Sequence, residues 1–287
     1  MMTTQQHILA CIDGSAVTES VCDYATWYAS RLNLPVALLH VSEVPASTRR
    51  DLSGSIGIDS RQLLLDELTQ LDEQRARVVN SYSNALIQDA KSHIKSYSDV
   101  EVNTYRRHGK LLPAIEHFNP KNRAIVMGRR REDHTNDRIN IGSQIETVVR
   151  ASSIPILISS AEFETPSSYM IAFDGSKTAI KATEMVANSE LLKGLQGHIV
   201  MIGNHDDATT NSLARVTMQL KKSGFTVEAH HLPESDVVTG LLQFQTEKAI
   251  DIIVVGAYGH SKWRQLFIGS TTTKIIAKTS SPIILLR

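Results

Sequence analysis

The chain has 287 residues, of which 41% are hydrophobic and 21% charged, and its 30 basic residues equal its 30 acidic residues in number. This composition is typical of a folded globular protein and excludes a disordered or fibrous chain. Basic and acidic residues are also equal in number within each half. This balance excludes a dedicated nucleic-acid binder and a protein held to anionic lipid, because both need an excess of basic residues.

Short apolar runs alternate with amphipathic segments through the first half of the chain, a pattern that predicts βαβ units and a mostly parallel sheet. We expect strands at 7–13, 35–41, 100–106, 124–128 and 155–159. We expect helices at 17–32, 61–96, 111–118 and 142–151.

The second half continues the same alternation after a polar linker at about 161–168. Its strands are predicted at 169–174, 198–203, 226–232, 251–256 and 282–286. Its helices are predicted at 177–193, 208–223, 235–248 and 269–279. Continuously apolar runs such as 252–255 are typical of strands that are buried on both faces.

The second half also repeats motifs of the first. An apolar run ending in Asp-Gly-Ser closes the first strand of each half, at 13–15 and at 174–176, which are 161 residues apart. The apolar run that ends at Gly128 recurs 128 residues later at Gly256. A period of this length indicates a duplicated domain, with about 33 additional residues in the first copy.

The additional residues lie between about 43 and 80, in a polar loop and the front of a long helix. One face of that helix is traced by apolar residues and an arginine, namely Leu64, Leu68, Leu71, Arg75 and Val78. We expect a surface helix packed on the sheet. The alternative is a lid or a partner-binding element, and apolar spacing alone does not separate the two.

A glycine-punctuated loop follows the fourth strand of the second half. Gly256 is followed by Gly259 after two residues and by Gly269 after nine more, and Ser270 and Thr271 then open a helix. A loop at the carboxyl end of a parallel strand is where open α/β sheets bind ligands. The glycines permit a positive φ and a close backbone approach, and the free N–H groups of the helix attract an anion. The loop therefore predicts a phosphate site.

These motifs resemble the universal stress protein family, in its tandem two-domain form, over essentially the whole chain. The family's nucleotide-binding signature is Gly-x2-Gly-x9-Gly-(Ser/Thr), which the second half reproduces in full. The resemblance implies an α/β fold of two tandem doubly wound parallel-sheet domains, of the adenine nucleotide alpha-hydrolase type, at 1–160 and 168–287. It also implies that the last strands of the two halves pair within the chain as a pseudo-dimer, and a further homodimer stays open.

The resemblance further implies a regulatory protein that binds ATP, or a related adenine nucleotide, in its C-terminal half. Asp174 is expected to contact adenosine, and the backbone of Ile202 and Gly203 to edge the base. The loop residues are expected to hold the ribose and phosphates, namely Gly256, Gly259, Gly269, Ser270 and Thr271. A magnesium ion is expected only as a companion of the nucleotide.

The first half departs from the signature. Arg131 stands where the second glycine belongs, and the gap to Gly142 is one residue longer. We expect this half to bind ATP weakly or not at all, because arginine does not permit the close backbone approach of glycine. The alternative is a separate anion site built from the arginines at 129–131.

Two further functions stay open: a nucleotide-independent interaction scaffold for an unknown protein partner, and a slow ATPase that uses His260 or Lys262. Histidine clusters are interpreted structurally: the acidic residues beside His205 as a helix start, and the adjacent pair at 230–231 as pointing to opposite faces of a strand. No metal site is predicted.

The sequence also predicts where the protein resides. The cysteine pair at 11 and 22 makes no disulfide framework, and the first residues show neither a signal peptide nor a membrane anchor. We expect a cytoplasmic protein that binds neither membrane nor nucleic acid.

Overall fold

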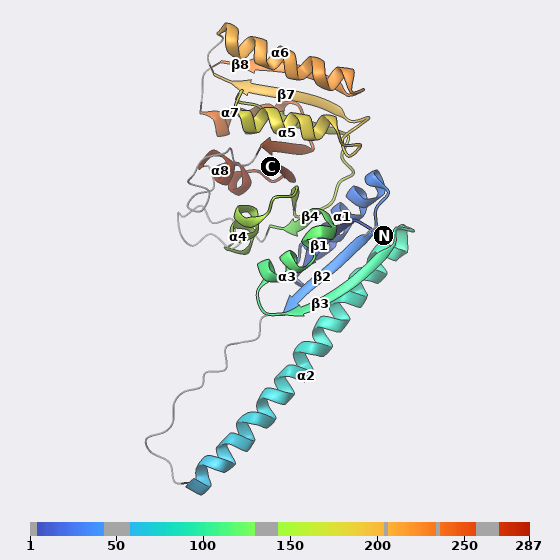
Figure 1. The fold of residues 1–287 in the computed structure, drawn as a ribbon, viewed down its shortest axis with the longest axis vertical. Helices are drawn as coiled ribbons and strands as arrows, with labels where there is room; N and C mark the ends of the chain where they lie inside the picture. Colours follow the sequence, from blue (N-terminus) through green and yellow to red (C-terminus); the bar gives the residue numbers. More distant parts are fainter. Residues whose placement is uncertain (1–4, 43–57, 130–142, 204–205, 234–235, 257–269) are drawn as a thin grey trace.

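A computed structural model describes residues 5–42, 58–129, 143–203, 206–233, 236–256 and 270–287. Its ten strands form one continuous sheet in the order β3-β2-β1-β4-β5-β10-β9-β6-β7-β8. Figure 1 shows β1, β2 and β3 toward one end of the molecule and β7 and β8 at the other. Five strands come from each half of the chain, and each half has the same strand order outward from the centre. The predicted α/β class and the duplication are therefore confirmed.

The strands lie close to their predicted positions. In the N-terminal half they are β1 (His7–Ile12), β2 (Val36–Ser42), β3 (Val102–His108), β4 (Asn122–Gly128) and β5 (Ile156–Ser159). In the C-terminal half they are β6 (Ser168–Ala172), β7 (Gln196–Ile202), β8 (Thr226–Leu232), β9 (Ile252–Gly256) and β10 (Ile283–Leu286).

The helices of the N-terminal half are α1 (Thr18–Leu32), α2 (Ile58–Tyr97), α3 (Leu111–His117) and α4 (Ser143–Ala151), with a 3-10 turn at Asn119–Lys121. Those of the C-terminal half are α5 (Lys177–Ala187), α6 (Asp207–Lys222), α7 (Val237–Glu247) and α8 (Ser270–Lys278). The prediction of a helix over 177–193 is wrong at its end: α5 stops at Ala187, and Leu191 and Leu192 are buried in the turn that follows.

The two halves join through their last strands. Strand β5 pairs antiparallel with β10, with Leu157 opposite Ile284, whereas all other strand pairs are parallel. This pairing protects strands that would otherwise be exposed edges, and it confirms the pseudo-dimer implied by the resemblance. Because the junction is antiparallel, the carboxyl ends of the strands in the two halves point in opposite directions. Any sites at their carboxyl ends therefore lie far apart.

Helices cover both faces of the sheet. One buried cluster packs α1, α2, α5 and α6 on one face, and a second packs α3, α4, α7 and α8 on the other. Each cluster contains residues from both halves, so the core is continuous across the junction.

Helix α2 is much longer than any other described helix and extends beyond the sheet (Figure 1). Its C-terminal part packs on α1 and the neighbouring strands through Ile87, Ala90 and Ile94, all buried. Toward the other end, Leu68 and Val78 are 50% and 69% exposed, so the expectation that this face of the additional residues packs on the sheet is wrong. No helix in the described part of the chain is long and apolar enough to span a bilayer.

Arginines reinforce the junction between the halves. On α1, Arg31 Nε donates to the carbonyl of Leu191 at 2.9 Å. At the C-terminus, Arg287 donates to the carbonyl of Arg150 at 3.0 Å. Arg129 donates to the carbonyl of Ile276 on α8. Each bond satisfies a backbone carbonyl near the end of a helix or in the turn after it, where intrahelical partners are lacking.

Candidate nucleotide site

The predicted site residues of the C-terminal half lie at the carboxyl ends of three neighbouring strands. Asp174 follows β6, Ile202 ends β7 and Gly203 comes directly after it, and Gly256 ends β9. Ser270 and Thr271 open α8, and Thr271 is exposed. The other two predicted residues, Gly259 and Gly269, lie outside the described residues. The sheet order β9-β6-β7 therefore brings Asp174, Ile202, Gly203 and Gly256 to the same end of the sheet.

The Asp-Gly-Ser turn positions the Asp174 carboxylate. Asp174 Oδ1 accepts the backbone N–H of Ser176 at 2.9 Å, while Gly175 adopts a φ of 73°. Ser176 then caps α5, because its hydroxyl accepts the N–H of Ala179 at 3.1 Å. The Asp174 side chain is exposed at the edge of the sheet. A carboxylate held in this way can accept hydrogen bonds from ligand hydroxyl groups.

Gly203 directly follows β7 and has a φ of 140°, a conformation that side-chain-bearing residues rarely adopt. Its N–H donates to the carbonyl of Leu232 at 3.2 Å. No described atom lies within 4 Å of the position that a β-carbon on Gly203 would occupy. The described part of the chain therefore leaves room beside the backbone of Ile202 and Gly203.

Gly256 has a packing role that the sequence analysis did not assign. A β-carbon there would lie 3.0 Å from the carbonyl oxygen of Thr178 and 3.2 Å from the α-carbon of Ala179. The missing side chain therefore lets the start of α5 approach the end of β9. The expectation of a positive φ at Gly256 is wrong, because its φ lies outside that region.

In the N-terminal half, side chains of the protein itself cover the carboxyl ends of the corresponding strands. A β-carbon on Gly14 would lie 2.0 Å from the hydroxyl of Tyr82, which belongs to α2. The Tyr82 ring also meets the edge of the His40 ring, with centroids 6.4 Å apart, and His40 Nδ1 donates to the carbonyl of Ile12 at 3.0 Å. In the corresponding turn of the C-terminal half, Met201 is the one described residue near the β-carbon position of Gly175, at 3.5 Å.

A second contrast lies at the end of the neighbouring strand. Given the parallel registers of the two halves, Ser42 at the end of β2 corresponds to Gly203, the residue directly after β7. The Ser42 hydroxyl lies 2.7 Å from Nδ1 of His108, so this side chain is bonded where Gly203 leaves space. Arg131 lies outside the described residues, whereas Arg129 is bonded to the carbonyl of Ile276 rather than free for an anion.

Comparisons with known proteins assign the chain to a family. The model of the universal stress protein family matches residues 5–160 and again residues 169–287. The universal stress protein Slr1230 of Synechocystis sp. (strain ATCC 27184 / PCC 6803 / Kazusa) is 31% identical over 98% of this chain and 100% of its own length. The chain belongs to the universal stress protein family. Its tandem arrangement follows from the two matches.

Solved structures give the same fold for this universal stress protein. A universal stress protein from Archaeoglobus fulgidus DSM 4304 superposes with a TM-score of 0.67 at 18% identity, over 98% of this chain and 96% of that one. The functionally unknown protein PA1789 from Pseudomonas aeruginosa PAO1 gives a TM-score of 0.62 at 15% identity, over 98% and 92%. At these identities the likeness concerns the fold alone.

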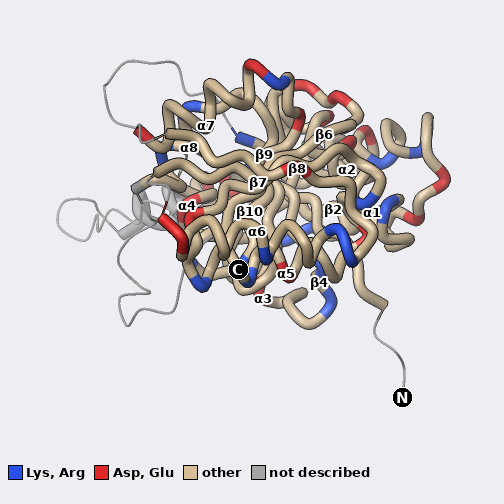
Figure 2. Tube along the Cα trace, turned by 90° about the horizontal axis from the view of Figure 1, so that it is seen from above, with Lys and Arg blue, Asp and Glu red and all other residues tan. Residues whose placement is uncertain are grey.

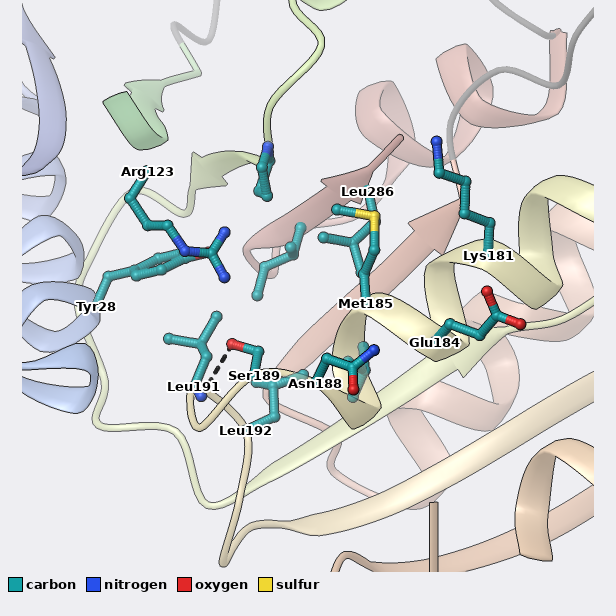
Figure 3. Close-up of a pocket in the computed structure, with 13 residues that line it drawn as sticks. Tyr28, Arg123, Lys181, Glu184, Met185, Asn188, Ser189, Leu191, Leu192 and Leu286 are labelled. Atoms are coloured by element: carbon teal, nitrogen blue, oxygen red, sulfur yellow. Dashed lines mark hydrogen bonds between the residues drawn. The ribbon is translucent and has the colours of Figure 1, made fainter. Parts of the chain in front are cut away.

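One described cavity lies away from the predicted site of this universal stress protein. It has a volume of about 370 Å³ at the junction of the two halves and is lined by Tyr28, Arg123, Met185 and Leu191 among others. Figure 3 shows the Arg123 guanidinium beside the Tyr28 ring and facing the cavity. Arg123 lies near the start of β4, and none of the predicted site residues that the structure describes lines the cavity. The candidate nucleotide site is therefore defined by the strand ends, not by this cavity.

Proposed function

We propose that the C-terminal half of this universal stress protein binds ATP or a related adenine nucleotide, and that occupancy regulates the protein rather than leading to catalysis. The observation that carries the proposal is the asymmetry between the two Asp-Gly-Ser edges. The β-carbon position of Gly14 lies 2.0 Å from the Tyr82 hydroxyl, whereas that of Gly175, its counterpart in the C-terminal half, has Met201 at 3.5 Å as its one neighbour among the described residues.

The described residues supply complementary chemistry for such a ligand. Asp174 would accept the ribose hydroxyls, since its carboxylate is exposed and held by one backbone N–H. The backbone at Ile202 and Gly203 would lie along the edge of the base. The first N–H groups of α8, next to Ser270 and Thr271, would bind phosphate oxygens, because a helix N-terminus attracts anions. A magnesium ion would arrive with the nucleotide phosphates.

The charge distribution supports a small anionic ligand rather than a nucleic acid. Basic and acidic residues are interspersed along the described part of the trace (Figure 2). The net charge of the whole chain is zero. Long-range attraction to a polyanion is therefore weak, and local N–H groups would supply the affinity.

An interaction scaffold is the second candidate function, and α2 favours it. Leu68, Leu71 and Val78 are 50%, 51% and 69% exposed on this helix. Apolar side chains exposed along one element are typical of a surface that binds a protein partner. The two functions are compatible if nucleotide occupancy in one half alters what the other half binds.

Thermal denaturation with matched variants tests the proposed site. At about 100 times its Kd, a ligand adds roughly 2.7 kcal/mol, which should raise the Tm of the wild type by about 5 °C. Asp174→Ala should lose most of this shift with ATP, and Asp13→Ala, the equivalent change in the N-terminal half, should retain it. An equal shift in both variants, or loss only in Asp13→Ala, would contradict the proposal.

A further inference from the structure

Three potential metal ligands, none of them a predicted nucleotide-site residue, gather on one face of the sheet. His198 lies on β7, and Glu228 and His230 lie two residues apart on β8. The parallel register places His198 opposite Glu228, so all three side chains project from the same face. One ligand atom from each residue lies within 4.8 Å of those from the other two.

The distances suit a single ion. Nδ1 of His198 lies 3.0 Å from Nε2 of His230, and Nε2 of His230 lies 3.7 Å from a carboxylate oxygen of Glu228. Two ligands of one tetrahedral zinc ion, each about 2.0–2.1 Å from the metal, lie roughly 3.3 Å apart. These two separations bracket that value, and the third, between His198 and Glu228, is within 4.8 Å. The Glu228 side chain is 63% exposed, so it is free to adjust its rotamer.

The surroundings hold both imidazoles in place and keep them neutral. Phe244 of α7 packs against both rings, with centroids 5.9 Å from His198 and 4.7 Å from His230. Burial lowers the pKa of both histidines. Lys248 and, for His230, the neighbouring His198 lower it further, while Glu228 opposes the shift. Neutral imidazoles offer a lone pair to a metal at neutral pH. Lys248 weakens the attraction for a cation, and Glu228 offsets it.

The N-terminal half lacks this cluster at the equivalent positions. From the registers of the two halves, His198 corresponds to Ala37, Glu228 to Asn103 and His230 to Tyr105. The Tyr105 ring packs on Phe118 with centroids 4.5 Å apart, much as His230 packs on Phe244. The fold therefore does not require histidine or glutamate here, since an alanine, an asparagine and a tyrosine serve in the twin.

We propose that His198, Glu228 and His230 bind a divalent transition metal ion, with zinc as the best match. Two imidazoles and one carboxylate are ligands of zinc-class ions, whereas magnesium and calcium prefer sites built from oxygen ligands. The ion replaces the hydrogen bond between the two histidines and links β8, an edge strand of the sheet, to β7. A remaining coordination position faces solvent on the side of Glu228, where a water or an external ligand completes the site.

Zinc titration of the tag-free, chelator-treated full chain tests the site, without added nucleotide because ATP itself binds zinc. Isothermal titration should give one site per chain in the wild type. His230→Tyr, which introduces the residue of the N-terminal twin, and Glu228→Gln should each weaken binding by about tenfold or more. Cobalt(II) should give a visible absorption band in the wild type that both variants lose.

His231→Gln is the matched control, since this histidine neighbours the cluster in sequence but projects from the opposite face of β8. It should bind zinc as the wild type does. Far-UV circular dichroism checks folding, and Glu228→Gln alters only an exposed side chain. Absence of a zinc site in the wild type, equal affinity in wild type and both cluster variants, or an equal loss in His231→Gln would each overturn the proposal.

Discussion

Leu157→Ala tests whether the antiparallel junction is a structural core of the molecule. Leu157 is fully buried in β5, opposite Ile284 of β10. Truncation removes three carbon atoms, worth roughly 2.4 kcal/mol at about 0.8 kcal/mol each. The cavity left behind adds to this, because neighbouring strands relax only partly, so the total loss should be about 3–4 kcal/mol.

Urea denaturation followed by circular dichroism measures that loss. With an m-value of about 3 kcal/mol/M, the midpoint should fall by about 1 M. Leu68→Ala provides the control, because it makes the same chemical change at a side chain that is 50% exposed on α2. It should change stability by about 0.5 kcal/mol or less. If Leu157→Ala shifted the midpoint no more than Leu68→Ala, the argument that the junction is a continuous core would be refuted.

Burial alone would raise the pKa of Asp251, but four hydrogen bonds from the two serines that precede and open β6 lower it. The ionised carboxylate should therefore stabilise the fold fully above its unfolded pKa of about 3.9, and this stabilisation should be lost as the pH falls through the lowered folded pKa. In urea denaturation, Asp251→Asn should lower the free energy of unfolding strongly at pH 7 and not at all in acid. A loss of stability that is the same at every pH would contradict this. Burial raises the pKa of Cys11 and Cys22 to about 12. Iodoacetamide at pH 7.5 should therefore alkylate both thiols only after unfolding. Rapid alkylation of the native protein would contradict this prediction. Gly197→Ala would place a β-carbon 2.6 Å from the Tyr169 ring, so the free energy of unfolding should fall by about 1–3 kcal/mol. Scanning calorimetry measures this loss, and an unchanged Tm would contradict the close packing at Gly197.

The repeated motifs predicted the duplicated α/β domains, and the family resemblance implied that the last strands of the two halves pair. Two Asp-Gly-Ser strand ends gave the register of the duplication, and the closing apolar runs gave the strands that pair at the junction. The helix start beside His205 is confirmed, since the Asp206 carboxylate caps α6 by accepting the N–H of Thr209 at 2.7 Å. These features are local, so short stretches of sequence determine them.

The features that sequence analysis missed depend on contacts between distant segments. Tyr82, which lies on α2, covers Gly14. This contact depends on how α2 packs on the sheet, and the sequence next to Tyr82 or Gly14 does not determine that packing. The sequence predicted that His230 and His231 point to opposite faces of their strand. It did not predict that His198 lies next to His230, because this contact depends on the register between β7 and β8. The end of α5 was misplaced because the apolar residues at 191–192 continue a helical pattern while packing in a turn.

Isothermal titration with ATP tests the claim that the C-terminal half carries the nucleotide site most directly. The wild type should bind one ATP per chain. Gly259→Arg, which introduces the arginine of the N-terminal loop, should abolish binding, and Arg131→Gly should leave the C-terminal site unchanged. ATP binding by Gly259→Arg with the affinity of the wild type, or its loss only in Arg131→Gly, would contradict the claim.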